Sequence, residues 1–204
     1  MIDLYTWTTP NGRKASVMLE EVGLPYEVHP VNIGADEQFK PDFLAISPNN
    51  KIPAIVDRDT RTSVFESGAI LIYLAETSGQ LLPTDAAARA KTLEWLMWQM
   101  ASWGPMLGQL NHFMRAAPEP VPYAVKRFTD EAVRLIGVLD KRLGQVEFVA
   151  GDYSIADVAI YTWAAVAMDP LKQAAGVEAP NIDRWLAAVG ARPAVQKGMA
   201  VPAV

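Results

Sequence analysis

Three short stretches of the sequence bring together side chains that could hold a small peptide with charged ends. NKIPAIVD, residues 50–57, places Lys51 and Pro53 at the entrance of a short, apolar segment rich in β-branched residues. FESGAI, residues 65–70, and TTPNGRK, residues 8–14, each place hydroxyl and charged side chains where a helical pattern begins. The chemistry open to each stretch depends on which groups its backbone leaves available.

In FESGAI, Glu66 and Ser67 stand at the junction between an expected strand and an expected helix. Ser67 suits an N-cap, and the unpaired N–H groups of a first helical turn attract a carboxylate. Glu66 beside it could hold an ammonium group, so the two residues would together form a receptor for the head of an α-amino acid. The alternative is an ordinary helix cap next to a solvated glutamate.

In NKIPAIVD, the proline cannot donate to a strand ladder, so Pro53 belongs at the start of a strand. A cis peptide bond between Ile52 and Pro53 would turn the backbone N–H and C=O of Ile52 outward. An extended peptide could then pair with them as an added strand would. The alternative is an ordinary trans proline at a strand entrance.

In TTPNGRK, two hydroxyls follow the end of an expected strand, and Pro-Asn-Gly then leads into a helix. This order places Thr8, Thr9 and Asn11 at a helix N-terminus, where they can donate hydrogen bonds. Such donors could stabilise a thiolate and lower its pKa. The alternative is simple capping of the helix by Thr9 or Asn11.

The composition argues against several classes of function. The 204 residues carry a net charge of −5 without a basic run, so we expect no nucleic-acid binding. Cysteine is absent and histidine occurs twice, which excludes zinc–thiolate sites and thiolate nucleophiles and argues against a histidine metal site. No apolar run approaches a membrane span, and the N-terminus lacks a signal-peptide pattern. We therefore expect a cytoplasmic protein with no metal and no membrane.

The first part of the chain alternates between strand and helix patterns in the order βαβαββα. A helix between two strands predicts a parallel pair, and a later hairpin adds an antiparallel pair. Pro30 argues that the second strand lies at an edge or bends. The expected strands cover residues 2–7, 26–33, 54–57 and 63–66, and the expected helices cover residues 11–23, 41–47 and 67–79.

Beyond a polar, proline-containing connection, nothing in the sequence indicates a strand. We expect an α/β domain over residues 1–80, a linker over 81–86 and an all-helical domain over 87–204. The first helix of that domain, residues 88–117, should bend at Gly104-Pro105, because proline removes a hydrogen bond from the helix. Later helices follow from apolar spacings of three and four residues. The spacing does not predict the course of residues 192–204.

These motifs, in this order, resemble those of the cytosolic glutathione transferases, which join a thioredoxin-like N-terminal domain to an all-helical C-terminal domain. The resemblance covers essentially the whole chain, and NKIPAIVD followed by FESGAILIYLAE is specific to that superfamily. DYSIADVAIY matches the superfamily's capping motif, with Ser154 as the cap and Asp157 three residues on. TPNGRK, EQFKPDFLAISPNNKIPAIVD and WGPMLGQLNHF are most similar to the nu-class, disulfide-bond-reductase type of bacterial glutathione transferases.

The resemblance implies which residues activate the thiol of glutathione. In tyrosine-dependent classes a catalytic tyrosine precedes the first helix, but Trp7 stands at that place here. The nu-like pattern implicates Thr9 and Asn11, with Thr8, at the position of the serine-dependent classes, as the alternative. Because adjacent strand residues face opposite ways, we expect one of the two threonines to reach the sulfur.

The resemblance also implies how the rest of glutathione is held. The Ile52 backbone would pair with the cysteinyl unit, in register because the proline that follows is cis. Glu66 and Ser67 would hold the γ-glutamyl end. Lys51 and Gln38 would reach the glycyl carboxylate, with a charge-assisted contact from the lysine.

One arginine of the helical domain carries a separate implication. Arg127 lies in YAVKRF, off the apolar face of its helix. In the nu-like group an arginine at this motif position reaches across a homodimer to the partner's glutathione. The alternative is a solvated arginine on a helix surface.

Taken together, the resemblance implies a glutathione:disulfide oxidoreductase, with peroxidase activity, that uses glutathione as cosubstrate and needs no metal. Because the chain has no cysteine, glutathione would supply the only sulfur nucleophile, with two glutathiones per cycle. One alternative is a transferase that conjugates glutathione to small apolar electrophiles. Another is a glutathione-binding regulatory protein without turnover. The natural second substrate does not follow from the sequence.

Overall fold

The computed structural model describes residues 1–173 and 175–204 in full and divides the chain into two compact units. The first unit comprises Met1–Thr84 and Gly190–Val204, and the second comprises Asp85–Val189. The division between Thr84 and Asp85 lies inside the segment that we expected to be a linker. The return of the C-terminal residues to the first unit differs from our expectation, which assigned them to the helical domain.

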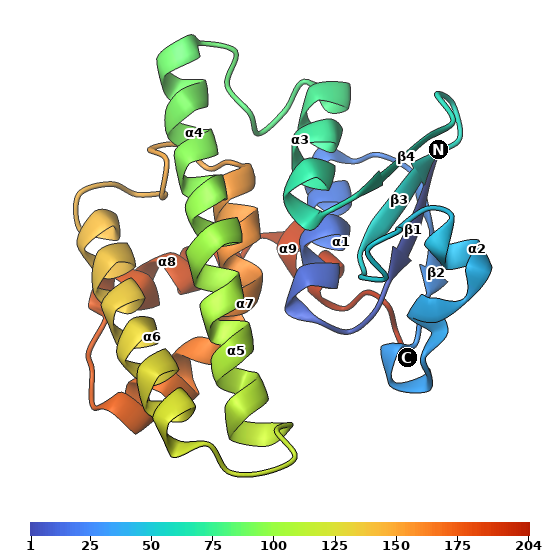
Figure 1. Cartoon of the computed structure of the whole chain (residues 1–204). Coiled ribbons are helices and arrows are strands. Elements are labelled where there is room, and N and C mark those ends of the chain that lie inside the picture. The colour runs from blue at the N-terminus through green and yellow to red at the C-terminus, as the bar shows by residue number, and fades with distance from the viewer. The chain divides into compact units, whose positions relative to one another are not determined.

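The first unit contains a four-stranded mixed sheet in the order β2-β1-β3-β4 (Figure 1). Strand β1 pairs in parallel with β2 and antiparallel with β3, and β3 pairs antiparallel with β4. Strand β2 lies at the edge and ends at Pro30, which has no N–H to donate to a ladder. The expected βαβαββα order is confirmed. The strands are β1 (Ile2–Thr6), β2 (Tyr26–Pro30), β3 (Ala54–Asp57) and β4 (Thr62–Phe65).

Two long helices of the first unit end as the sequence predicts. Helix α1 (Pro10–Val22) has proline in its first turn and ends at Gly23, whose φ of 67° is left-handed. Helix α3 (Ser67–Ser78) ends at Gly79 with a φ of 70°. Glycine is favoured at both ends because it has no Cβ to clash in this conformation. Short elements fill the connection from β2 to β3: η1 (Ile33–Ala35), η2 (Glu37–Phe39) and α2 (Pro41–Leu44).

The C-terminal helix α9 (Pro193–Met199) packs against α1 within the first unit (Figure 1). The contact is close enough to require glycine, because a Cβ on Gly198 would lie 2.4 Å from the Cα of Val17. The Ser16 hydroxyl donates to the Gly198 carbonyl at 2.7 Å. The carboxylate of Glu21 accepts two hydrogen bonds from Arg192, each at 2.7 Å. The helix that carries TTPNGRK is therefore held by the opposite end of the chain.

The second unit is helical over its main elements. The single helix expected over residues 88–117 is instead two α-helices joined by a π-helical segment. The interruption falls directly before Gly104-Pro105, where proline removes a helical hydrogen bond. No helix among the described residues combines the length and apolar character that crossing a bilayer requires. The elements are α4 (Ala86–Trp98), η3 (Gln99–Trp103), α5 (Gly104–Arg115), α6 (Pro122–Leu143), α7 (Ile155–Ala175) and α8 (Pro180–Gly190).

The predicted capping box at the start of α7 is confirmed. The Ser154 side chain accepts from the Ala156 amide, and the Asp157 carboxylate accepts from the Ser154 amide at 3.1 Å. The same carboxylate accepts from the Val149 amide at 3.0 Å and from the Trp185 indole at 2.9 Å. Burial raises the pKa of Asp157 to about 6, against the lowering effect of these donors. Asp157 thus joins α7, α8 and the loop before α7.

Candidate active site

The sheet register brings the three candidate stretches to one end of the sheet. Tyr5 of β1 pairs with Ala54 of β3, and Ala54 pairs with Phe65 of β4. The chain continues from Tyr5 into TTPNGRK, arrives at Ala54 from NKIP, and continues from Phe65 into ESGAI. Segments separated by about 55 residues in sequence therefore meet because one row of strand pairs aligns them.

Thr9 is the N-cap of α1, as the capping alternative predicted. Its Oγ1 accepts a hydrogen bond from the Gly12 amide at 3.0 Å. This bond uses an acceptor lone pair and leaves the hydroxyl proton able to donate, so capping and sulfur binding are compatible. The helix begins so close to β1 that a Cβ on Gly12 would lie 2.4 Å from both Thr6 Oγ1 and the Trp7 carbonyl.

The two threonines differ in exposure, although not for the reason we expected. Thr8 is exposed and Thr9 is partly buried. Strand β1 ends at Thr6, so both residues lie in the turn after it and the strand alternation does not apply to them. Asn11 follows in the first turn of α1 and is partly buried.

The peptide bond between Ile52 and Pro53 is cis. Neither the N–H nor the C=O of Ile52 makes a hydrogen bond with a residue that the structure describes. Ile52 is partly buried and packs on a small apolar cluster built from Val31, Phe43 and Ala54. Its main chain therefore keeps a donor and an acceptor beside the start of β3.

The junction between β4 and α3 differs from the sequence expectation in one respect. We expected Ser67 to be the N-cap, but Glu66 takes that position and Ser67 is the first helical residue. The Glu66 carbonyl accepts the first helical hydrogen bond, from the Ile70 amide at 2.9 Å. Glu66 has a φ of 71° and a ψ of 116°, a conformation that a side chain disfavours. Its carboxylate is exposed and accepts from Asn49 at 3.3 Å.

Sequence reasoning missed a lysine at this end of the sheet. Lys14 of α1 is 1% exposed, and its Nζ lies 3.4 Å from Ser67 Oγ. Burial lowers the pKa of Lys14 to about 7, and the charge of Glu66 acts in the opposite direction. The spacing contained a signal, because Lys14 lies four residues before Met18 and eight before Val22 on the buried face of α1.

The two residues expected at a glycyl carboxylate lie on the chain between β2 and β3. Gln38 is in η2, and its Oε1 is buried without a hydrogen-bond partner among the described residues. Lys51 is exposed, and its backbone carbonyl accepts from the Ser47 hydroxyl at 2.9 Å. Both side chains are polar groups with capacity to bind, one partly buried and one in solvent.

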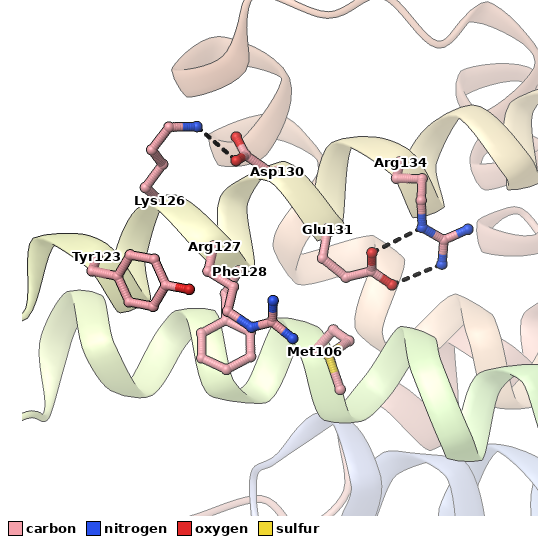
Figure 2. A pocket seen from close by; sticks show the side chains of 8 residues that line it. All are labelled: Met106, Tyr123, Lys126, Arg127, Phe128, Asp130, Glu131 and Arg134. Atoms are coloured by element: carbon pink, nitrogen blue, oxygen red, sulfur yellow. Dashed lines mark hydrogen bonds and ion pairs between the residues drawn. The ribbon is translucent and has the colours of Figure 1, made fainter.

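Arg127 belongs to the second unit and is exposed on α6, off the buried face as expected. It lines an open groove of about 590 Å³ between α5 and α6, where its side chain extends toward Met106 (Figure 2). The neighbouring charges in the groove are paired: Lys126 with Asp130 at 2.6 Å, and Arg134 with Glu131 at 2.7 Å. Arg127 itself makes no hydrogen bond or ion pair with a described residue.

A cluster of potential metal ligands at the sheet is occupied by an arginine. Asp3, Glu27 and His29 lie within metal-ligating distance of one another. The Arg58 guanidinium bonds both carboxylates, at 2.6 Å to Glu27, and His29 bonds Asp3 at 2.7 Å. These contacts hold the pKa of Asp3 at about 2, with the Arg58 hydrogen bond as the largest cause. The cluster is an ion-pair network around Arg58.

The chain matches known proteins over most of its length. The family model described as "Glutathione S-transferase, N-terminal domain" matches residues 8–77. The disulfide-bond oxidoreductase YfcG of Escherichia coli is 52% identical over 80% of this chain and 79% of that protein. The disulfide-bond oxidoreductase YghU of the same organism is 42% identical over 98% of this chain and 74% of that protein.

Solved structures agree with these matches. A glutathione transferase family member from Pseudomonas fluorescens, solved with two glutathiones bound, has a TM-score of 0.93 and 46% identity, covering 98% of this chain and 93% of that one. A glutathione transferase from Pseudomonas putida, with one glutathione disulfide bound per subunit, has a TM-score of 0.92 and 45% identity, covering 98% and 91%. The chain belongs to the glutathione transferase family, with the disulfide-bond oxidoreductases YfcG and YghU among its relatives.

Proposed function

We propose that this protein is a glutathione-dependent disulfide-bond oxidoreductase in which the thiolate of bound glutathione is the nucleophile. The observation that supports it most is the meeting of three polar stretches at one end of the sheet in a member of this family. Relatives named as disulfide-bond oxidoreductases, and neighbours holding glutathione or its disulfide, support the same activity.

Each group at this end of the sheet has a part of glutathione that it could bind. The Ile52 amide and carbonyl, which make no hydrogen bond to a described residue, pair with the cysteinyl backbone. The Glu66 carboxylate holds the γ-glutamyl ammonium, and Ser67 at the start of α3 holds the α-carboxylate. Lys51 and Gln38 bind the glycyl carboxylate.

The thiol is then bound at the start of α1. The Thr9 hydroxyl, which already caps the helix, donates its proton toward the sulfur, and Asn11 and the first-turn amides add further positive dipoles. Donors and a helix N-terminus stabilise a thiolate over a thiol, so they lower the pKa of the sulfur. Thr8 is exposed and remains the alternative donor.

The reaction balances with glutathione alone. One glutathione thiolate attacks a disulfide RSSR, forming a mixed disulfide and releasing one RS⁻. A second glutathione thiolate attacks the glutathione sulfur of the mixed disulfide, forming glutathione disulfide and releasing the second RS⁻. Two glutathiones lose one electron each, and the disulfide gains two. The chain has no cysteine that could replace either thiolate.

We assign Arg127 to the same function through a homodimer in the cytoplasm. Its unpaired guanidinium lines the α5–α6 groove, and an arginine suits a carboxylate supplied by a second copy. Sedimentation with and without glutathione measures the assembly. An Arg127→Gln variant with a raised KM for glutathione supports the assignment, whereas an unchanged KM contradicts it.

Turnover with two substrates tests the proposed activity. Purified protein should reduce hydroxyethyl disulfide with glutathione and should conjugate 1-chloro-2,4-dinitrobenzene slowly. Faster conjugation than reduction would favour the conjugating alternative. Binding of glutathione without turnover of either substrate would favour a regulatory role.

A further inference from the structure

Lys14 is a basic side chain that lies buried beside Ser67. Its Nζ lies 3.4 Å from Ser67 Oγ, and the residue is 1% exposed between α1 and α3. Removing an ammonium group from water is unfavourable unless nearby groups compensate it. Methionine would fill much of the same space without a charge, so packing alone does not require a lysine here.

Glu66 provides a carboxylate that acts on Lys14. Glu66, at the start of α3, raises the pKa of Lys14 through its charge, but it is exposed and shared with Asn49. The other elements packed on α1 also carry charged groups. They are Asp3 of β1, bound to Arg58 and His29; Arg192 and Lys197 of α9, the former bound to Glu21; and Glu76 in the last turn of α3.

Two sources of positive potential therefore meet at Ser67. The first is the N-terminus of α3, where the helix dipole and the first-turn amides favour an anion. The second is Lys14, whose Nζ lies 3.4 Å from Ser67 Oγ. An anion bound at Ser67 is stabilised by the helix N-terminus and by Lys14. A neutral group of the same shape gains neither stabilisation.

We propose that Lys14 is a positioning residue that makes the site at Ser67 select an α-carboxylate, and that it takes up a proton as this carboxylate binds. The inference rests on the proposed function, because that function places the γ-glutamyl carboxylate of glutathione at Ser67. It adds a residue that acts through Ser67, and a coupling between ligand binding and pH.

The sign of the coupling follows from the burial of Lys14. Burial lowers its pKa to about 7, so in the free protein the side chain is largely neutral at pH 8. A carboxylate at Ser67 favours the charged form and raises this pKa, so binding takes up roughly half to one proton at pH 8. Because binding takes up protons, affinity should weaken by about tenfold between pH 6.5 and 8.5.

Calorimetry with S-methylglutathione measures this coupling without ionisation of the ligand thiol. Titrations at pH 8 in phosphate and in Tris, which differ in ionisation enthalpy, report the number of protons taken up. For the wild type we expect Lys14 to take up roughly half to one proton at pH 8. For Lys14→Met we expect an uptake smaller than that of the wild type by this amount, because the ligand ammonium held by Glu66 titrates in both proteins. We also expect an affinity at pH 6.5 that is about tenfold to a hundredfold weaker, and a flatter pH profile than that of the wild type.

Two further variants separate the charge of Lys14 from its structural role. Lys14→Arg stays charged at every pH used, so it should bind tightly with only the small proton uptake of the ligand ammonium that Lys14→Met also shows. Lys51→Met, the same exchange at an exposed lysine, should weaken binding and keep the proton uptake of the wild type. An S-methyl analogue with γ-aminobutyrate in place of γ-glutamate lacks the α-carboxylate and should bind the wild type and Lys14→Met equally.

The outcomes distinguish this inference from the function on which it rests. If the wild type does not bind S-methylglutathione, the proposed function fails and the role of Lys14 fails with it. If the wild type binds S-methylglutathione but takes up no more protons than Lys14→Met, the inference alone is wrong. Equal loss of affinity by Lys14→Met for the ligands with and without the carboxylate would also overturn it.

Discussion

The contact between α9 and α1 gives a test in which one chemical change has opposite effects at two sites. In Gly198→Ala the added Cβ would lie 2.4 Å from Val17 Cα and 2.6 Å from Val17 N. Ordinary contacts begin near 3.4 Å, so the two backbones must separate by roughly 1 Å. These atoms belong to the backbone of α1 and cannot rotate away as a side chain would.

The free-energy cost has two parts and one offset. Overpacking of this kind costs about 1–3 kcal/mol. Separation of α9 also weakens the buried hydrogen bond from Ser16 Oγ to the Gly198 carbonyl, worth about 1 kcal/mol. The higher helix propensity of alanine returns about 1 kcal/mol. We therefore expect Gly198→Ala to lower the free energy of unfolding by about 2 kcal/mol, and Tm by roughly 4–8 °C.

Gly137 of α6 provides the matched control. A Cβ added at Gly137 meets no atom within 4 Å, and the residue is exposed in mid-helix. Gly137→Ala should therefore raise the free energy of unfolding by about 0.5–1 kcal/mol.

Urea unfolding followed by tryptophan fluorescence compares the two variants. Hydrogen exchange should show faster exchange in α1 and α9 for Gly198→Ala and unchanged exchange there for Gly137→Ala. A Gly198→Ala protein as stable as the wild type, with unchanged protection of α1, would refute the close backbone contact.

Three further predictions follow from the described contacts. Thr9→Val should raise the pKa of the bound glutathione thiol by roughly 1–2 units and lower turnover at pH 7 by about 10–100-fold. Thr9→Ser keeps the hydroxyl and should keep most of the activity. The same pH–rate profile for both variants would contradict the role of the hydroxyl. Asp157→Asn should lower the free energy of unfolding in urea by about 3 kcal/mol, because the amide cannot accept from the Val149, Ser154 and Trp185 donors together. Asp157→Ala, which accepts from none of them, should lose more stability, and an equal or smaller loss would contradict this reasoning. Burial lowers the pKa of Lys14 to about 7, so above pH 7 the unfolded chain binds a proton that the folded chain releases. The free energy of unfolding of the wild type should therefore rise relative to that of Lys14→Met by about 1.4 kcal/mol per pH unit up to about pH 9. Parallel curves of stability against pH for the two proteins would contradict the burial of this charge.

Much of the fold follows from local signals in the sequence. Gly23 and Gly79 end α1 and α3 because only glycine adopts the left-handed conformation without a steric cost. Pro30 ends an edge strand because it has no N–H for a second ladder. The capping box at Ser154 is also a local pattern, since its groups lie within three residues of one another.

Two features of the helices differ from the predictions made from sequence patterns. The N-cap of α3 is Glu66 and not Ser67, because the chain leaves the sheet with a left-handed residue at that point. The expected single helix over residues 88–117 contains a π-helical segment.

By itself, the sequence determined the element order of the first unit, the C-terminal ends of α1 and α3, and the polar stretches with the chemistry to bind a peptide. Tertiary structure alone decided that TTPNGRK, NKIP and ESGAI share one end of the sheet, because only the pairing of Tyr5, Ala54 and Phe65 aligns them. It also decided that Lys14 is buried beside Ser67 and that α9 lies on α1. Hydrogen bonds within a helix or turn join residues that are close in the sequence, so they can be predicted from it. Burial depends on which distant part of the chain covers a side chain, so it cannot.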